Sequence, residues 1–294
     1  SGGSTAGSDG IRDAYKCAEK HFDSSIVNRV ILATDGDFNV GISDPKKLKD
    51  YIETKRDTGI YLSVLGFGQG NYQDEIMQTL AQNGNGVAYY IDSIHEAKKV
   101  LVDELAATLF TLAKDVKFQI EFNPAHVAEY RLIGYETRAL KDEDFNNDKI
   151  DSGDVGAGHS VTAIYEITPT SSSFRFIDKH RYAEKKQATT HTNEIAFLKI
   201  RYKHPKNKKS QLNTYPITEK NSYPHINKAP AEIRFSSAVA AFGQRLQNST
   251  YTQNLNYDSI LKIAQESKGK DPYGYRSELL NLIQIAKMLD QLDD

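Results

Sequence analysis

The sequence is poor in the residues that build disulfides, cysteine metal sites and membrane spans. It contains one cysteine, Cys17, and no tryptophan. A single cysteine excludes an intramolecular disulfide and a cysteine-based zinc site. No apolar run approaches the roughly 20 residues of a membrane-spanning helix, so we expect no membrane span in this chain.

An excess of positive charge is also missing. The 37 Lys and Arg residues are balanced by 39 Asp and Glu residues, which gives a formal net charge of −2. Nucleic-acid-binding proteins concentrate Lys and Arg against the phosphate backbone, so this composition argues against nucleic acid as a partner. The hydrophobic fraction of 39% suits a globular chain of 294 residues with two or three domains.

Residues 1–113 alternate between helical and extended patterns. The apolar runs predict strands at 30–34, 60–66 and 87–91, and the 3.6-residue periodicity with its capping residues predicts helices at 9–21, 44–58, 72–82 and 93–108. Repeated strand–helix units of this kind predict an α/β domain with a parallel, doubly wound sheet.

After residue 113 the hydrophobic period changes from helical to two. Residues 114–222 are therefore predicted to form an antiparallel β-sandwich, with strands at 117–122, 130–135, 160–167 and 196–202 and with turn-rich segments at 146–148 and 152–158. Residues 223–294 are predicted to form a small α-helical C-terminal domain, with helices at 235–246, 257–267 and 277–292.

Asp35 is the first candidate functional residue. The apolar run at 30–34 leads directly into Asp35-Gly36, which is typical of a strand buried on both faces of a parallel sheet. Ligands of open α/β sheets bind outside the carboxyl ends of such strands. From the residues alone, Asp35 is either a ligand there or the first residue of an Asp-Gly turn.

Three segments in order resemble the von Willebrand factor A family: Gly-Gly-Ser-Thr-Ala-Gly at 2–7, Leu-Ala-Thr-Asp-Gly-Asp-Phe-Asn at 32–39 and Ser-Val-Leu-Gly-Phe-Gly at 63–68. The resemblance implies a Rossmann-like domain that holds a divalent cation, usually Mg²⁺, in a metal-ion-dependent adhesion site above the sheet. It implies that Thr5 and Asp35 are metal ligands. The positions that would support the site are Ser4, Gly36, Asp37, Asn39, Gly66 and Gly68.

The sequence departs from the family at the first metal-binding loop. No Asp-x-Ser-x-Ser motif precedes Thr5, so the chain resembles the C-terminal part of an A domain. Because Mg²⁺ demands six oxygen ligands in near-ideal geometry, we expect an incomplete site that binds Mg²⁺ weakly or not at all in this chain. We also expect the strand at 30–34 to have an exposed edge, which favours pairing with another chain into an oligomer.

The resemblance extends beyond the first domain. The segments Ala-Gly-His-Ser-Val-Thr-Ala-Ile-Tyr-Glu at 157–166 and Asp-Pro-Tyr-Gly-Tyr-Arg-Ser-Glu at 271–278 are similar to those of bacterial von Willebrand A proteins with a C-terminal domain of unknown function. That similarity implies a location in the cell envelope for the parent protein, which would be periplasmic or anchored to the membrane.

Three further motifs are better explained by structure than by chemistry. Gly66 to Gly70 resembles a dinucleotide fingerprint, but Asn71 stands where its third glycine belongs. His159 and Ser160 are neighbours on an extended segment and would point to opposite sides, so they do not form a nucleophile–base pair. The basic run from Arg201 to Lys209 is interpreted as a solvated hairpin loop.

These observations predict a non-enzymatic binding or adhesion module. Its cation would accept a carboxylate from a protein partner, as the family resemblance implies. The alternative is a structural or assembly scaffold of the bacterial cell envelope, in which the metal site is vestigial and the β-sandwich makes the contacts.

Overall fold

The computed structural model describes residues 7–35, 45–68, 74–104, 111–135, 140–148, 152–177, 193–205, 207, 209–252 and 255–293. The chain divides into two compact units. The first comprises Ser1–Gln119, Asp142–Ser160 and Ile200–Asn213, and the second comprises Ile120–Lys141, Val161–Lys199 and Thr214–Asp294. The predicted domain boundaries at 113/114 and 222/223 stay predictions.

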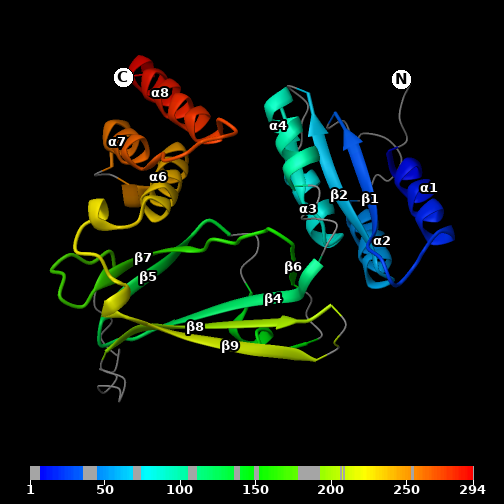
Figure 1. The fold of residues 1–294 in the computed structure, drawn as a ribbon, viewed down its shortest axis with the longest axis horizontal. Coiled ribbons are helices and arrows are strands. Elements are labelled where there is room, and N and C mark those ends of the chain that lie inside the picture. Colours follow the sequence, from blue (N-terminus) through cyan, green and yellow to red (C-terminus); the bar gives the residue numbers. More distant parts are fainter. Residues whose placement is uncertain are drawn as a thin grey trace. The chain divides into compact units, whose positions relative to one another are not determined.

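The first unit contains the predicted parallel sheet. Its strands follow the order β1-β2-β3, with β1 at Asn28–Thr34, β2 at Ile60–Phe67 and β3 at Ala88–Ile91. Both strand pairs are parallel, and Figure 1 shows β1 and β2 side by side. Helix α1 (Gly7–Lys20) precedes β1, helices α2 (Pro45–Asp57) and α3 (Asp74–Asn83) connect the strands, and α4 (Ile94–Lys98) follows β3. The α/β fold class predicted for this region is confirmed.

The buried central strand is β2, not β1. Seven of the eight residues of β2 are buried, from Ile60 to Gly66. In the described part of the chain β1 pairs with β2 alone, and Ile31 of β1 is 46% exposed. The prediction that the strand ending at Asp35 is buried on both faces was therefore wrong, whereas its predicted place at a sheet edge is confirmed. Both strands are apolar runs, so the sequence pattern does not distinguish edge from centre.

Helices cover both faces of the sheet because side chains alternate along β2. Leu62 and Val64 pack in a core cluster with residues of α1, α2 and α3. Leu65 points to the other face and packs against Ile91 and Val100. Val100 belongs to a π-helical segment, Lys99–Glu104, that continues from α4, so the long helix predicted at 93–108 is regular only to Lys98.

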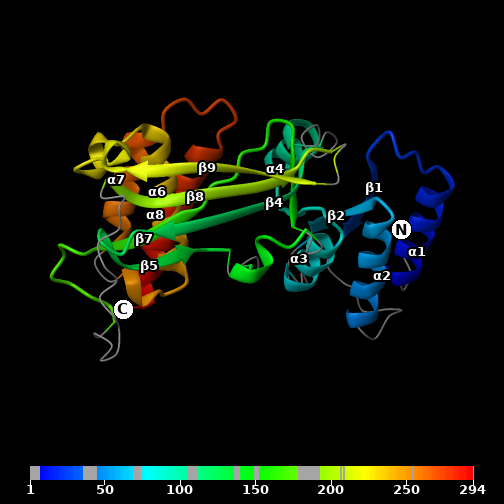
Figure 2. The same ribbon diagram turned by 90° about the horizontal axis from the view of Figure 1, so that it is seen from below.

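Antiparallel strands follow, as predicted. One sheet has the order β6-β4-β8-β9, and β5 pairs with β7 in a second, two-stranded sheet. Figure 2 shows β4, β8 and β9 side by side. The bounds are Thr111–Phe122 for β4, Val127–Ile133 for β5, Gly153–Gly156 for β6, Ile164–Pro169 for β7, Glu194–Lys203 for β8 and Ser210–Thr218 for β9.

Two strands were not predicted from the sequence. β6 lies within the glycine-rich segment at 152–158, which was interpreted as a turn. β9 contains Pro216, which removes a backbone donor and argues against a central strand. Because β9 is the edge strand of its sheet, one side of its backbone needs no partner there and Pro216 is tolerated.

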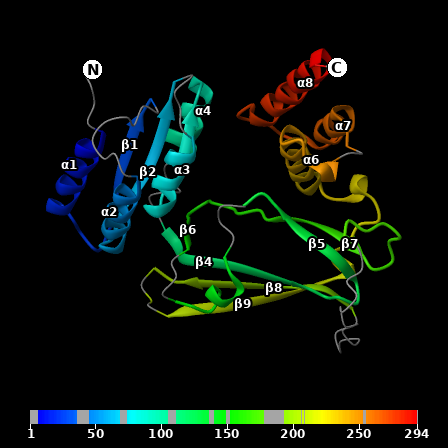
Figure 3. The ribbon, with the colours of Figure 1, turned by 180° about the vertical axis from the view of Figure 1, so that it is seen from behind.

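Three helices form the C-terminal region, as predicted: α6 at Ala231–Leu246, α7 at Tyr257–Ser267 and α8 at Tyr275–Asp293 (Figure 3). Asn256 caps α7 by accepting a hydrogen bond from the backbone N–H of Ser259. The core of the three helices consists of Ala238, Phe242, Tyr257, Ile260, Ala264 and Ile283. Among the described residues, no helix is both long and apolar enough to span a membrane.

The loop between α3 and β3 lies directly on β2, and Gly86 permits this. The N–H groups of Leu62 and Val64 donate to the carbonyls of Gly84 and Val87 at 2.8 and 3.0 Å. A Cβ atom at Gly86 would lie 1.7 Å from the carbonyl oxygen of Leu62. Any side chain there would have to displace the backbone of the central strand.

We predict that Gly86→Ala lowers the free energy of unfolding by at least about 2–3 kcal/mol, because the clash is with backbone and not with a flexible side chain. Chemical denaturation followed by circular dichroism measures this. Gly10→Ala is the control. It lies within α1 with open space around its Cα, so it should raise stability by up to about 1 kcal/mol through helix propensity. Equal effects of the two substitutions would contradict the close packing of the loop on β2.

Tyr15 fixes α1 to the sheet at an energetic cost. Its side chain is fully buried and meets the ring of Tyr51 edge-on, with ring centroids 5.7 Å apart. Among the described residues, its hydroxyl has no hydrogen-bond partner. Burial, and next the proximity of Tyr51, raise the pKa of Tyr15 well above the usual 10.0. The folded state therefore keeps the phenol neutral at a pH at which the unfolded chain ionises.

We predict that Tyr15→Phe leaves stability unchanged at pH 7 or raises it by about 1 kcal/mol, because a buried hydroxyl without a partner is removed. Above pH 10 the wild type should lose stability as the unfolded phenol ionises, and the variant should lose less. Denaturation midpoints at pH 7 and at successive pH values above 10 test both statements. A large loss of stability at pH 7 would show that the hydroxyl has a partner that matters.

Candidate functional site

Asp35 and Gly68, which follow β1 and β2, lie close together at the carboxyl edge of the parallel sheet. Thr34, the last residue of β1, is in register with Gly66 of β2, so Asp35 and the end of β2 lie at the same edge. Gly68 has a φ of +92°, which side chains disfavour, and a Cβ atom added there would lie 3.7 Å from the carbonyl oxygen of Asp35. Gly68 thus permits both the positive φ and the close approach to Asp35.

β3 contributes a third residue to this edge. Gly66 is in register with Tyr90, and the hydroxyl of Tyr90 donates a hydrogen bond of 2.6 Å to the carbonyl oxygen of Gly68. This bond fixes the loop that carries Gly68 beside Asp35. Tyr90 was not among the predicted site residues. The only feature of the sequence that could have indicated its role is its position just before the end of the short strand predicted at 87–91.

The structure describes only some of the predicted site residues. Asp35 and Gly68 lie together at the sheet edge, whereas Gly66 lies inside β2 and not in a loop. The remaining predicted positions are outside the described residues: Ser4, Thr5, Gly36, Asp37 and Asn39.

The chemistry of this edge suits a hard cation only in part. Asp35 supplies one carboxylate, the donor type that Mg²⁺ prefers. Within the described part of the chain, no three His, Cys, Asp or Glu residues gather in a way that could hold a metal. A cation at Asp35 would therefore need ligands from the segments outside the described residues, where Ser4, Thr5 and Asp37 belong.

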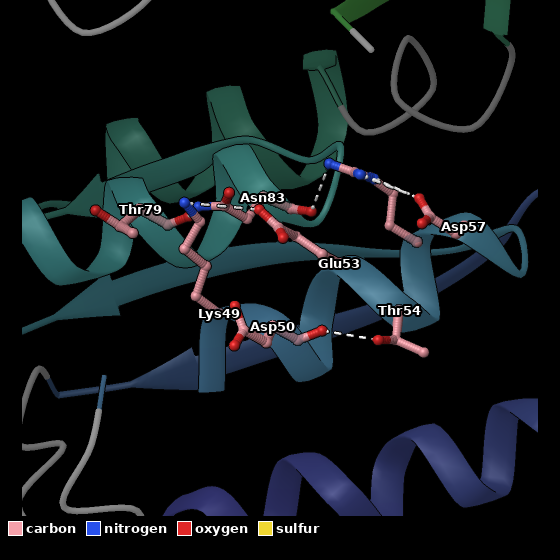
Figure 4. Close-up of polar contacts among 8 residues, drawn as sticks. Lys49, Asp50, Glu53, Thr54, Asp57, Thr79 and Asn83 are labelled. Carbon is pink, nitrogen blue, oxygen red and sulfur yellow. Dashed lines mark hydrogen bonds and ion pairs between the residues drawn. The ribbon is translucent and has the colours of Figure 1, made fainter. Parts of the chain in front are cut away.

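The opposite, amino-terminal edge of the sheet borders a cleft of about 250 Å³ within the first unit. Near it, Arg56 at the end of α2 donates to Asp57 and to the carbonyl oxygen of Asn83 at the end of α3, and Figure 4 shows the polar contacts of these two helices. The cleft mixes cations with carboxylates in equal number. The lining residues are Arg56, Asp57, Tyr61, Asn85, Lys114, Asp115, Asp154 and Lys203.

The charges at this cleft are largely paired with one another. Arg29 is half-buried, donates to the hydroxyl of Ser63 at 2.6 Å and lies 5.6 Å from the ring centre of Tyr61. Burial lowers the pKa of Arg29, and the charge of Asp154 partly opposes this. A surface with balanced and internally paired charges has no preference for an anionic or a cationic ligand, so we assign the cleft a structural role.

Asp115 is the centre of this charge network. It is 2% exposed and lies between two ammonium groups, with Lys117 at 3.2 Å and Lys203 at 2.9 Å. An irregularity in the β4–β6 register falls between Ala113 and Val116, and Asp115 has a φ of +52° there. The bulge turns an acidic residue of the strand inward, toward the buried Lys117 and the partly buried Lys203.

The basic run from Arg201 to Lys209 is therefore not simply a solvated loop. Lys203 pairs with Asp115 and donates to the carbonyl oxygen of Asp148. Arg201 donates to Ser210 and Asn146 at 2.7 and 2.8 Å. The interpretation of these two residues as solvated was wrong. Their partners include Asn146 and Asp148, which are 55 residues away, and the local charge pattern does not reveal such partners.

We predict that Asp115→Asn lowers the free energy of unfolding by about 3 kcal/mol. The substitution leaves the fully buried Lys117 without its carboxylate, which is the costly way to break a buried pair. Asparagine tolerates the positive φ, so the effect reports charge and not backbone strain. Glu121→Gln is the control, since its pair with Lys199 is exposed and should change stability by less than about 1 kcal/mol. Urea denaturation of both variants measures the two losses of stability. Similar, small losses would contradict the assigned role of Asp115.

The C-terminal part of the chain matches a known protein family. Residues 107–289 match the family described as "Uncharacterized protein YfbK, C-terminal". The uncharacterized protein YfbK of Escherichia coli (strain K12) is 48% identical over 286 residues, which are 97% of this chain and 49% of that protein. The chain thus spans about half the length of this relative. Inter-alpha-trypsin inhibitor heavy chain H3 of Mesocricetus auratus is 28% identical over 172 residues, 54% of this chain and 19% of that protein.

Solved von Willebrand A proteins are among the structural neighbours. A von Willebrand factor type A protein from Catenulispora acidiphila aligns with a TM-score of 0.45 and 14% identity over 97% of this chain and 63% of that one. The ArnB paralog VWA2 from Sulfolobus acidocaldarius aligns with a TM-score of 0.37 and 15% identity over 91% and 66%. The expected kinship with bacterial proteins whose C-terminal domain has no known function is confirmed by the match over residues 107–289, and the chain belongs to the YfbK family.

Proposed function

We propose that this chain is a non-enzymatic binding module that recognises a carboxylate of a protein partner at the carboxyl edge of its parallel sheet. The observation that supports the proposal is the meeting of three strands there. Asp35 follows β1, Gly68 follows β2 beside it, and Tyr90 of β3 holds the carbonyl of Gly68. Ligand sites of open α/β sheets lie at this edge.

The residues have distinct parts in the proposal. The carboxylate of Asp35 and the hydroxyl of Thr5 would hold a divalent cation of the Mg²⁺ type. When bound, the cation supplies an open coordination position for the carboxylate of the partner. Gly68 allows the neighbouring loop to approach Asp35, and Tyr90 keeps that loop in place.

The proposal implies a weak site in this chain. Mg²⁺ requires six oxygen ligands in near-ideal octahedral geometry and gives up its water reluctantly. Two protein oxygens leave most of the coordination positions to water. We therefore expect affinity in the high-micromolar to millimolar range, and saturation of the site only at millimolar Mg²⁺.

Calorimetric titration of the chain with Mg²⁺ tests the cation, and a display selection tests the ligand. Random peptides selected on the immobilised chain should be rich in Asp and Glu in millimolar Mg²⁺ and should lose this enrichment in EDTA. We predict that Asp35→Asn abolishes both the heat of Mg²⁺ binding and the Mg²⁺-dependent enrichment, because it removes the charged ligand and keeps the side-chain volume.

Asp92→Asn is the matched control, since Asp92 follows β3 at the same edge of the sheet but is not a predicted ligand. It should preserve binding. Low-micromolar affinity for Mg²⁺ would contradict the weak site. Acidic peptides that still bind in EDTA, or that bind the Asp35→Asn variant, would favour the alternative of a scaffold with a vestigial metal site.

A further inference from the structure

Helix α8 has two apolar faces, and only one of them is used within its unit. Ile283 is fully buried, and Leu279, Leu280 and Ala286 pack with it against the core formed with α6 and α7. The opposite face carries five large apolar side chains that are each about half exposed or more. We call this set the outer strip: Leu282 (49%), Ile285 (48%), Met288 (57%), Leu289 (57%) and Leu292 (80%).

The spacing of the outer strip is that of a helix–helix seam. Leu282, Ile285, Leu289 and Leu292 follow one another at intervals of three, four and three residues. This is the alternation of the two apolar positions of a heptad, which pack into the holes of a facing helix. Scattered exposed apolar residues are normal, but a continuous strip over three turns of one helix marks an interaction surface.

Between Asn281 and Leu292, the charged residues of α8 lie off the outer strip and have partners on other helices. Lys287 pairs with Asp258 of α7, and Asp290 pairs with Arg245 of α6 at 3.2 Å. The exposed residues interspersed with the strip along this part of the helix are Asn281, Gln284 and Gln291, which are uncharged. Within the span from Leu282 to Leu292, two copies of the strip therefore bring no like charges together, and the exposed Glu278 lies one turn before this span.

We propose that the outer strip of α8 pairs with the same strip of a second copy of this chain. A symmetric helix pair of this kind is self-complementary, because each copy presents the same apolar seam. With these exposed fractions the five side chains present roughly 500 Å² per copy, so the pair removes on the order of 1,000 Å² from water. That area is at the lower limit of specific interfaces, and it predicts a weak, reversible dimer with a dissociation constant of about 10–100 µM.

The chemistry of the strip favours a protein over a lipid surface. A helix that lies on a membrane combines its apolar face with flanking Lys and Arg that contact the anionic headgroups. The outer strip has no such cations beside it, because Lys287 is engaged by Asp258. The outer strip is apolar and its neighbours are uncharged, so a second copy of the same strip is complementary to it.

Sedimentation velocity of the whole chain over a concentration series tests the proposal. The wild type should change from monomer to dimer between about 1 and 200 µM, as expected for a weak interface. The double variant Ile285→Lys, Leu289→Lys should stay monomeric throughout. Both positions are half exposed, so the folded monomer should survive, and circular dichroism checks this. Leu289→Gln, which adds no charge, should weaken association at least several-fold.

Two controls separate this surface from others. Ile233→Lys on α6 changes a residue of equal exposure, 48%, outside the strip and should leave the dimer intact. Ile31→Lys places a charge on β1 at the edge of the parallel sheet and should also leave it intact. A wild type that is monomeric at every concentration overturns the proposal. So does a dimer that survives the double variant, or one that is lost in Ile31→Lys and not in the double variant.

Discussion

The burial of β2 on both faces is the constraint on which the first unit depends. A strand buried in this way must be covered by helices above and below and paired at both edges. Leu62 and Val64 accordingly hold α1, α2 and α3 on one face, and Leu65 packs with Val100 on the other. The same strand sets the register of β1 and β3, and this register brings Asp35, Gly68 and Tyr90 to one edge. The candidate site is a consequence of the packing of a strand that contributes none of these three residues.

The two edges of the sheet illustrate different uses of charge. At the amino-terminal edge the charged groups satisfy one another: Asp115 lies between Lys117 and Lys203, and Arg29 lies on the ring of Tyr61. Burial makes such groups costly unless they are paired, so they define one arrangement of strands β4, β6 and β8. At the carboxyl edge Asp35 is accompanied by glycine and backbone. A carboxylate beside a glycine turn is the group that the proposed ligand would use there.

Much of the architecture could be predicted because local patterns repeat over whole elements. The helix at 257–267 was predicted at its observed bounds, since Asn256 is a cap and the apolar period is regular. The prediction failed where tertiary context overrides the local pattern. β9 carries a proline that only an edge strand tolerates, and β6 is a strand made from a glycine-rich segment. For the candidate site, Asp35 and Gly68 could be found from their positions after strands. Tyr90 could not, because its role depends on which strand is the neighbour of β2.

The sequence by itself determined the order of the fold: a parallel α/β sheet, then antiparallel strands, then three helices. Hydrophobic periodicity and capping residues are local properties, so they are readable without knowing the neighbours of a segment. The tertiary structure alone decided which strand is central, which charges are buried and which helix face stays uncovered. Val30 to Thr34 and Ile60 to Gly66 are equally apolar, yet one is an edge strand and the other is the core. Likewise α8 is apolar on two sides, and only the packing of α6 and α7 shows which side is left for a partner.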